Sequence, residues 1–224
     1  HIPRVGYHHF ELPPQDGRVY YMIGDPGTGN PPARNAPVWM IFDVTEAPKV
    51  ITVQAMWWGF GNGSITPFIS QMLEWLPKYK PLVCGIDNTS TQKNMAEIIN
   101  IQYINEQGFS VTKIIGFDFS GSKRYTYLVC LKLSIENGAV RWPACVQGIG
   151  SQLQNYDPLL DKASGAKIPQ DIVATMSMAL YKIRAEYGSF DEGNRASVEP
   201  SVEQAFIARR SGREFPAQFR DTRR

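Results

Sequence analysis

The chain has 224 residues, of which 43% are hydrophobic and 20% are charged, and its formal net charge is +2. This composition predicts one globular domain of moderate size, and it argues against a membrane protein because no apolar run is long enough to span a bilayer. The small net charge neither requires nor excludes a nucleic-acid partner.

Three widely spaced cysteines, Cys84, Cys130 and Cys145, form no CxxC pair. They predict neither a zinc site nor a disulfide framework, and they favour a reducing, intracellular setting. We expect no signal peptide from the residues that open the sequence. The first residue is His1 rather than Met, as expected of a fragment of a longer protein.

Short apolar runs, separated by Gly and Pro, define the elements expected in the first part of the chain. Residues 1–17 are expected to form an irregular lead-in. Strands are expected at 19–24, 38–44 and 49–58. Because their connections are short, we expect these strands to form an antiparallel meander.

From residue 66 onward, helical and strand patterns alternate. Helices are expected from 66 to about 77, from about 92 to 106, at 123–136 and at 168–186. Strands are expected at 82–86 and 111–117, with short edge strands at 140–143 and 152–155 and a mobile loop between those two. The 123–136 segment also alternates like a strand, but its length and the Asn137-Gly138 stop favour a helix. This order predicts an α/β fold with a mixed sheet.

Three aspartates stand where chemistry is expected. Asp25 and Asp87 each end a buried apolar strand, and Asp171 opens the last helical segment. Each has an ordinary explanation, since Asp is common in turns, before helices and in a first helical turn. Bringing three carboxylates together is costly unless cations neutralise them. Together they therefore predict a site for Mg²⁺ or Mn²⁺. Asp43 and Asp118 are interpreted as solvated or turn residues.

Four motifs occur in an order that resembles the C-terminal nuclease domain of phage large terminase subunits. They are YMIGDPG at 21–27, GIDNT at 85–89, GSKR at 121–124 and IPQDIVA at 168–174. The resemblance covers about residues 18–187, followed by an Arg-rich tail at 188–224. It implies an RNase H-like fold: a mixed central sheet, with a three-strand antiparallel meander plus parallel strands, flanked by helices.

The resemblance also implies an activity and a set of site residues. The activity is metal-dependent endonucleolytic cutting of double-stranded viral DNA concatemers during genome packaging, with two Mg²⁺ or Mn²⁺ ions. By resemblance, Asp25, Asp87 and Asp171 are the metal ligands. The sequence departs from many members at Gln170 and Asn30, where those members carry acids.

Several partners follow from the same resemblance. The family's packaging ATPase domain is expected outside this chain, which contains no Walker A sequence. The tail is a candidate for contacts with the portal or procapsid, and the expected location is the host cell cytoplasm. No membrane partner is expected.

Ser122, Lys123 and Arg124 are the candidate contacts to the DNA backbone, because small and cationic residues at a helix start attract phosphate. A solvated helix start explains them equally well. Two alternative functions stay open. One is another RNase H-fold nuclease of the resolvase or transposase type. The other is a catalytically weak DNA-binding or capsid-docking module.

Overall fold

The computed structural model describes residues 8–27, 36–59, 64–89, 94–105, 113–156 and 171–188. The chain divides into two compact units, His1–Gly188 and Ser189–Arg224, and all described residues belong to the first. The predicted tail at 188–224 therefore lies, apart from Gly188, outside the described residues. Among the described helices, none is both long and apolar enough to cross a bilayer.

The described strands form one sheet with the order β1-β4-β3-β2-β5-β6, and β7 pairs with β4. The strands are β1 (His8–Glu11), β2 (Tyr20–Asp25), β3 (Val38–Glu46), β4 (Val50–Trp58), β5 (Val83–Asp87), β6 (Ile115–Phe117) and β7 (Val140–Arg141). Strands β2, β3 and β4 pair antiparallel, as the short connections predicted. Strand β5 lies parallel to β2, and β6 lies parallel to β5.

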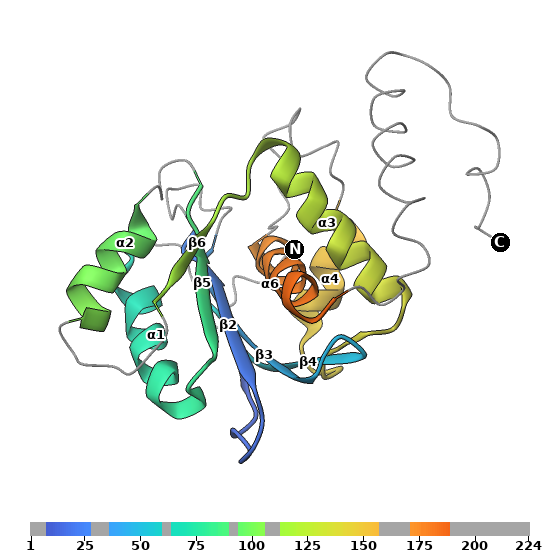
Figure 1. The fold of residues 1–224 in the computed structure, drawn as a ribbon, viewed down its shortest axis with the longest axis horizontal. Coiled ribbons are helices and arrows are strands. Elements are labelled where there is room, and N and C mark those ends of the chain that lie inside the picture. The colour runs from blue at the N-terminus through green and yellow to red at the C-terminus, as the bar shows by residue number, and fades with distance from the viewer. Residues whose placement is uncertain are drawn as a thin grey trace. The chain divides into compact units, whose positions relative to one another are not determined.

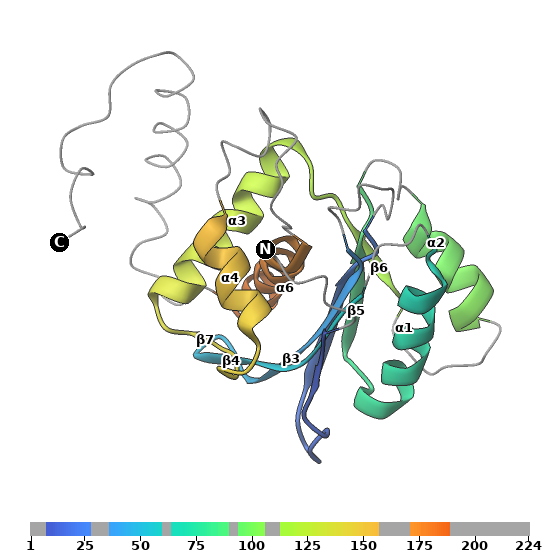
Figure 2. The same ribbon diagram turned by 180° about the vertical axis from the view of Figure 1, so that it is seen from behind.

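Helices cover both faces of the sheet. The described helices are α1 (Thr66–Tyr79), α2 (Met95–Ile99), α3 (Gly121–Glu136), α4 (Gln147–Asn155) and α6 (Asp171–Tyr187), and the π-helix η2 (Asn100–Asn105) continues α2. Figures 1 and 2 show α1 and α2 on one face and α3, α4 and α6 on the other. Helix α6 packs directly against β2, β3 and β5, and α3 and α4 pack against α6.

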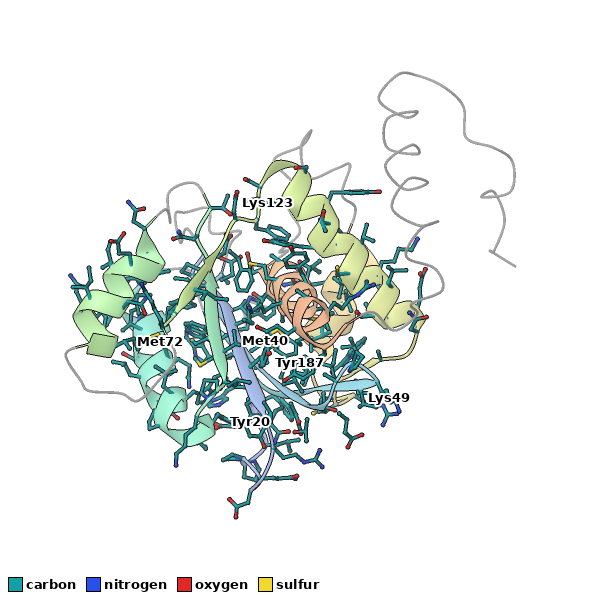
Figure 3. The ribbon with its side chains drawn as sticks, in the orientation of Figure 1. Tyr20, Met40, Lys49, Met72, Lys123 and Tyr187 are labelled. Atoms are coloured by element: carbon teal, nitrogen blue, oxygen red, sulfur yellow. The ribbon has the colours of Figure 1, made fainter. Side chains whose placement is uncertain are left out.

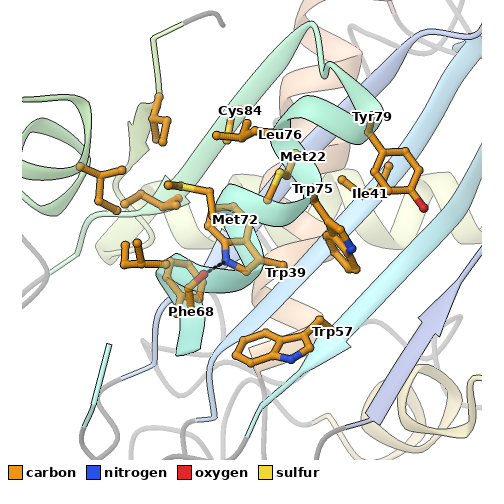
Figure 4. Packing of buried hydrophobic residues seen from close by; sticks show 14 of the residues in the cluster. Met22, Trp39, Ile41, Trp57, Phe68, Met72, Trp75, Leu76, Tyr79 and Cys84 are labelled. Carbon is orange, nitrogen blue, oxygen red and sulfur yellow. Dashed lines mark hydrogen bonds between the residues drawn. The ribbon is translucent and has the colours of Figure 1, made fainter. Parts of the chain in front are cut away.

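The core beneath α1 fixes how β2 lies in the sheet. Trp39 of β3 stacks on Phe68 of α1 with 4.3 Å between ring centroids, and its indole N–H donates to the Phe68 carbonyl at 2.8 Å (Figure 4). Gly24 of β2 lies under the Trp39 ring, where a Cβ would come within 2.4 Å of a ring carbon. Glycine is therefore required one residue before Asp25 for the indole to pack against the strand.

The opposite face of the sheet packs against α6. Met40 lies between the sheet and this helix (Figure 3), and Tyr21 donates a hydrogen bond to Glu186 of α6. Every residue of α6 from Asp171 to Leu180 is buried. A helix that is buried on all sides must lie in the interior, here between the sheet and α3 and α4.

Several element predictions were wrong in detail. The segment predicted as a mobile loop and an edge strand at 152–155 is the helix α4. Its buried residues Ile149 and Gln152 are three apart, which is a helical spacing. Gly148 allows close packing, since a Cβ there would lie 3.3 Å from the Ile172 side chain. Tertiary packing thus accounts for Gly148, whereas a Cβ at Gly150 would meet no atom within 4 Å, so this glycine is compatible with the helix without a packing reason.

Two other departures have local causes. The lead-in contains the edge strand β1, which pairs antiparallel with β4 but is only four residues long and mostly polar. The predicted strand at 111–117 is described as a strand only over Ile115–Phe117. Before it, the Asn100 side chain exchanges two hydrogen bonds of 2.8 Å with the backbone of Ile114, in place of ladder pairing.

Candidate active site

Two of the three predicted aspartates end adjacent parallel strands. The last paired residues of β2 and β5 are Gly24 and Ile86, so Asp25 and Asp87 follow at the same edge of the sheet. Side chains alternate along a strand, and both aspartates fall on the face that α6 covers, the face of Tyr21. The two carboxylates are buried, with 8% and 9% of the residue exposed. The strand pattern thus predicted their placement correctly.

Asp171 approaches the same edge from the start of α6. Its Oδ2 accepts a hydrogen bond of 2.9 Å from the backbone N–H of Ala36, just before β3. Burial raises the pKa of Asp171 well above the usual range, and the negative charge of Asp25 raises it further. The structure therefore brings these two carboxylates within electrostatic range, although they are 146 positions apart in the sequence.

Both strand-end aspartates are oriented by local backbone. The N–H of Gly27 donates to Asp25 Oδ1 at 2.9 Å, and the N–H of Thr89 donates to Asp87 Oδ1 at 2.9 Å. Burial is the main cause that raises the pKa of Asp87; its hydrogen bonds to Thr89 lower it, and the charge of Asp118 raises it again. Both aspartates thus accept the short-range backbone hydrogen bond that is typical of Asp in turns, and this bond holds each carboxylate in a fixed orientation.

The donor set suits a hard divalent cation. Carboxylate oxygens are the ligands that Mg²⁺ and Mn²⁺ prefer, and the charges that perturb Asp87 and Asp171 come from other carboxylates. Within the described part of the chain, however, no three His, Cys, Asp or Glu side chains are gathered closely enough to hold one ion together. The aspartates converge on one edge without forming a pre-assembled three-ligand centre.

The predicted DNA contacts lie in the first turn of α3, at the end of the sheet opposite Tyr20 (Figure 3). Lys123 forms an exposed ion pair of 3.1 Å with Asp118. The Arg124 guanidinium lies 5.3 Å from the ring centroid of Phe119 and donates to the Tyr156 hydroxyl at 3.2 Å. Both cations are thus held near the strand ends.

The first turn of α3 also shows how its backbone is arranged. Gly121 has a φ of +53°, which favours glycine at the point where the chain enters the helix. The Ser122 carbonyl accepts a hydrogen bond from the Thr126 hydroxyl.

Sequence reasoning missed two residues that connect the site. The Thr89 hydroxyl accepts a hydrogen bond of 2.6 Å from the backbone N–H of Phe119, which ties the end of β5 to the segment after β6. Gln152 of α4 accepts a hydrogen bond of 3.0 Å from the N–H of Ile172, directly after Asp171. Thr89 stood inside a quoted motif, whereas Gln152 had been assigned to an edge strand.

Asp43 and Asp118 behave as interpreted from the sequence. Asp43 accepts a hydrogen bond from the Thr45 N–H and pairs with Arg18 at 3.5 Å. Asp118 is exposed, and hydrogen bonds from Ser120 and Lys123 lower its pKa.

The sheet order, the central helix and the carboxylates at the strand ends define an RNase H-like fold, as predicted. The crystal structure of the large terminase nuclease from thermophilic phage G20c with bound zinc is similar, with a TM-score of 0.56 and 18% identity over 82% of this chain and 90% of that chain. The fowlpox virus Holliday junction resolvase gives a TM-score of 0.41 and 15% identity over 75% of this chain and 99% of that chain. A scan against protein-family models and a search of curated proteins found no match. The resemblance predicted from the four motifs is thus confirmed at the level of the fold.

Proposed function

We propose that this chain is a metal-dependent endonuclease that cuts double-stranded viral DNA concatemers during genome packaging. The observation that carries the proposal is the convergence of Asp25, Asp87 and Asp171 on one sheet edge. Burial raises the pKa of both Asp87 and Asp171; the charge of Asp25 raises that of Asp171 further, and the charge of Asp118 raises that of Asp87. Such a cluster is costly without cations. The fold shared with the phage G20c large terminase nuclease supports this function.

Each aspartate has a distinct role in the proposed mechanism. Asp25 and Asp87 would hold one Mg²⁺ or Mn²⁺ ion, and Asp25 and Asp171 would hold a second. When bound, two such ions would supply an activated water and charge stabilisation for the departing 3′ oxygen of a phosphodiester. Hydrogen bonds from the backbone of Gly27, Thr89 and Ala36 orient the three carboxylates.

Ser122, Lys123 and Arg124 are proposed to hold the DNA backbone beside the carboxylates. A guanidinium fixed against an aromatic ring loses less conformational freedom when it binds phosphate than a free one does. Backbone contacts position DNA without reading its sequence. We therefore expect cutting with weak sequence preference.

The partners proposed here follow from the same function. The packaging ATPase domain would act with this domain, and the Arg-rich tail at 188–224 would contact the portal or procapsid. The proposed place of action is the host cell cytoplasm.

Supercoiled plasmid provides the direct test. The chain is incubated with plasmid in Mg²⁺, Mn²⁺ or EDTA, beside an Asp87→Asn variant. Asp43→Asn is the matched control, because Asp43 makes the same backbone hydrogen bond two residues onward but lies at the other end of the sheet. We expect metal-dependent nicking and linearisation that Asp87→Asn abolishes and Asp43→Asn retains. Cutting that survives in Asp87→Asn would contradict the proposed role of this residue.

A DNA-binding or docking module without nuclease activity is the second candidate. It is favoured by the lack of a three-ligand group among the described residues, and by Gln170 and Asn30 where many terminase nucleases carry acids. Such a module would bind DNA with a steep salt dependence and leave plasmid intact in Mn²⁺. A resolvase-type nuclease would instead prefer a four-way junction over linear duplex, so both substrates belong in the assay.

A further inference from the structure

A single peptide group fixes the backbone of Asp171 at the start of α6. This peptide group joins Asp171 to Ile172. Its carbonyl, which belongs to Asp171, accepts a hydrogen bond of 2.8 Å from the Thr175 hydroxyl. Its N–H, that of Ile172, donates to Gln152 Oε1 at 3.0 Å. The first N–H groups of a helix have no acceptor within the helix. Gln152 supplies one from another helix, α4.

The position of Gln152 is itself rigid. The residue is 4% exposed and belongs to α4, which packs against α6. One turn earlier, Gly148 gives α4 close access to the Ile172 side chain. A side chain with this little freedom can hold the start of α6 in one place.

The chemistry of Gln152 argues for more than packing. Its Nε2 is buried, and none of the residues that the structure describes is a hydrogen-bond partner for it. A buried donor without a partner is unfavourable; Met at this position would remove that donor, but it would also leave the Ile172 N–H without its acceptor. The amide is useful for its oxygen, which holds the peptide that follows Asp171.

We propose that Gln152 is a positioning residue for Asp171, an inference that rests on the proposed role of Asp171 as a metal ligand. The carboxylate is fixed by the Ala36 N–H, and the backbone that carries it is fixed by Gln152. Together these two contacts set the direction in which Asp171 faces Asp25. Residues that hold metal ligands in place commonly change metal affinity 10- to 100-fold when they are replaced.

Gln152→Met tests this role, with Gln54→Met as the matched control. Gln54 is also buried, at 5% exposed, and its side chain donates a hydrogen bond to the backbone carbonyl of Pro13, away from the carboxylates. Two readouts are used: hydrogen exchange of the Ile172 amide in metal-free protein, and the Kd for Mn²⁺ by calorimetry. We expect Gln152→Met to exchange faster at Ile172 and to bind Mn²⁺ about tenfold more weakly. Saturating Mn²⁺ should restore cutting, and Gln54→Met should match the wild type in both readouts.

A shorter amide guards against a folding defect in Gln152→Met. Gln152→Asn keeps the polar group but withdraws its oxygen from Ile172, so Mn²⁺ binding should weaken in the same direction. If both variants fold and bind Mn²⁺ as the wild type does, the inference is overturned while the proposed function stands. If the wild type binds no Mn²⁺ and cuts no plasmid, the proposed function is wrong and the inference falls with it.

Discussion

Carboxylates at the two ends of the sheet have different charged neighbours: cations at one end and other carboxylates at the other. Where β2 begins, acids are paired with cations: Glu11 lies 2.6 Å from Lys78, and Glu186, whose pKa is raised by burial alone, lies 2.6 Å from Lys182. Burial alone would raise the pKa of Glu11, but hydrogen bonds from Lys78 and Tyr79 bring it below the usual value. Where β2 ends, burial and other carboxylates raise the pKa of Asp87 and Asp171.

This contrast separates charges that stabilise the fold from charges that are candidates for function. A carboxylate whose partner is a cation contributes to folding, modestly when it is near the surface. Buried carboxylates that face other carboxylates oppose folding until something neutralises them. Groups with strongly perturbed pKa values are candidates for function for this reason. At the edge where β2 and β5 end, the ionised carboxylates therefore destabilise the metal-free fold.

The largest expected effect comes from neutralising one acid at each end. Asp25→Asn should lower the rate of Mn²⁺-dependent plasmid nicking by about a thousandfold or more, because ion-mediated charge stabilisation contributes several kcal/mol and each 1.4 kcal/mol is a factor of about ten. Its Tm should not fall. Glu11→Gln should keep nicking but lose about 1 kcal/mol of stability, a Tm decrease of about 2–4 °C. Gel assays and thermal melts check both, and the reverse pattern would refute the contrast.

The sequence predicts those features of this contrast that depend on neighbouring residues, and it misses those that depend on contacts between distant residues. Asp25 and Asp87 were placed correctly because an apolar strand followed by an acid is a local pattern, and parallel strands end at one edge. The contact of Asp171 with Ala36 is long-range, and only the motif order suggested its neighbourhood. Gln152 was missed because Gly148 and Gly150 favoured a loop, and the packing of α4 on α6 that overrides them leaves no mark in local composition.

The pH dependence of metal-free stability gives a sharper, smaller test. The folded-state pKa of Asp171 is raised, so protonation of its carboxyl stabilises the fold. This stabilisation is fully present below the unfolded carboxyl pKa of about 3.9, and it is lost as the pH rises through the raised folded-state pKa. Asp171→Asn removes that loss and keeps an acceptor oxygen for the Ala36 N–H.

In EDTA we therefore expect Asp171→Asn to melt above the wild type at pH 7–8, by about 2–4 °C for each kcal/mol of repulsion removed. The difference should shrink as pH falls. Asp43→Asn, at the paired end of the sheet, should show no such gain. A variant that melts below the wild type at every pH would mean that the Asp171 carboxylate stabilises the fold, as Glu11 does.

The smallest effect is expected when single cations are replaced. One cation at each end of the sheet, Arg124 and Lys49, can be compared by its contribution to DNA affinity. Arg124→Ala should reduce the salt slope of DNA binding by about one, because one phosphate contact is lost. That corresponds to less than about tenfold in Kd at 0.1 M salt. Arg124→Lys should keep the slope but weaken binding, since lysine lacks the planar group that lies over Phe119. Lys49→Ala, an exposed cation beside the β3–β4 turn, is the control and should change neither quantity. Equal losses for Arg124→Ala and Lys49→Ala would mean that DNA is attracted by the overall charge of the domain, and that the strand-end surface has no special role in binding it.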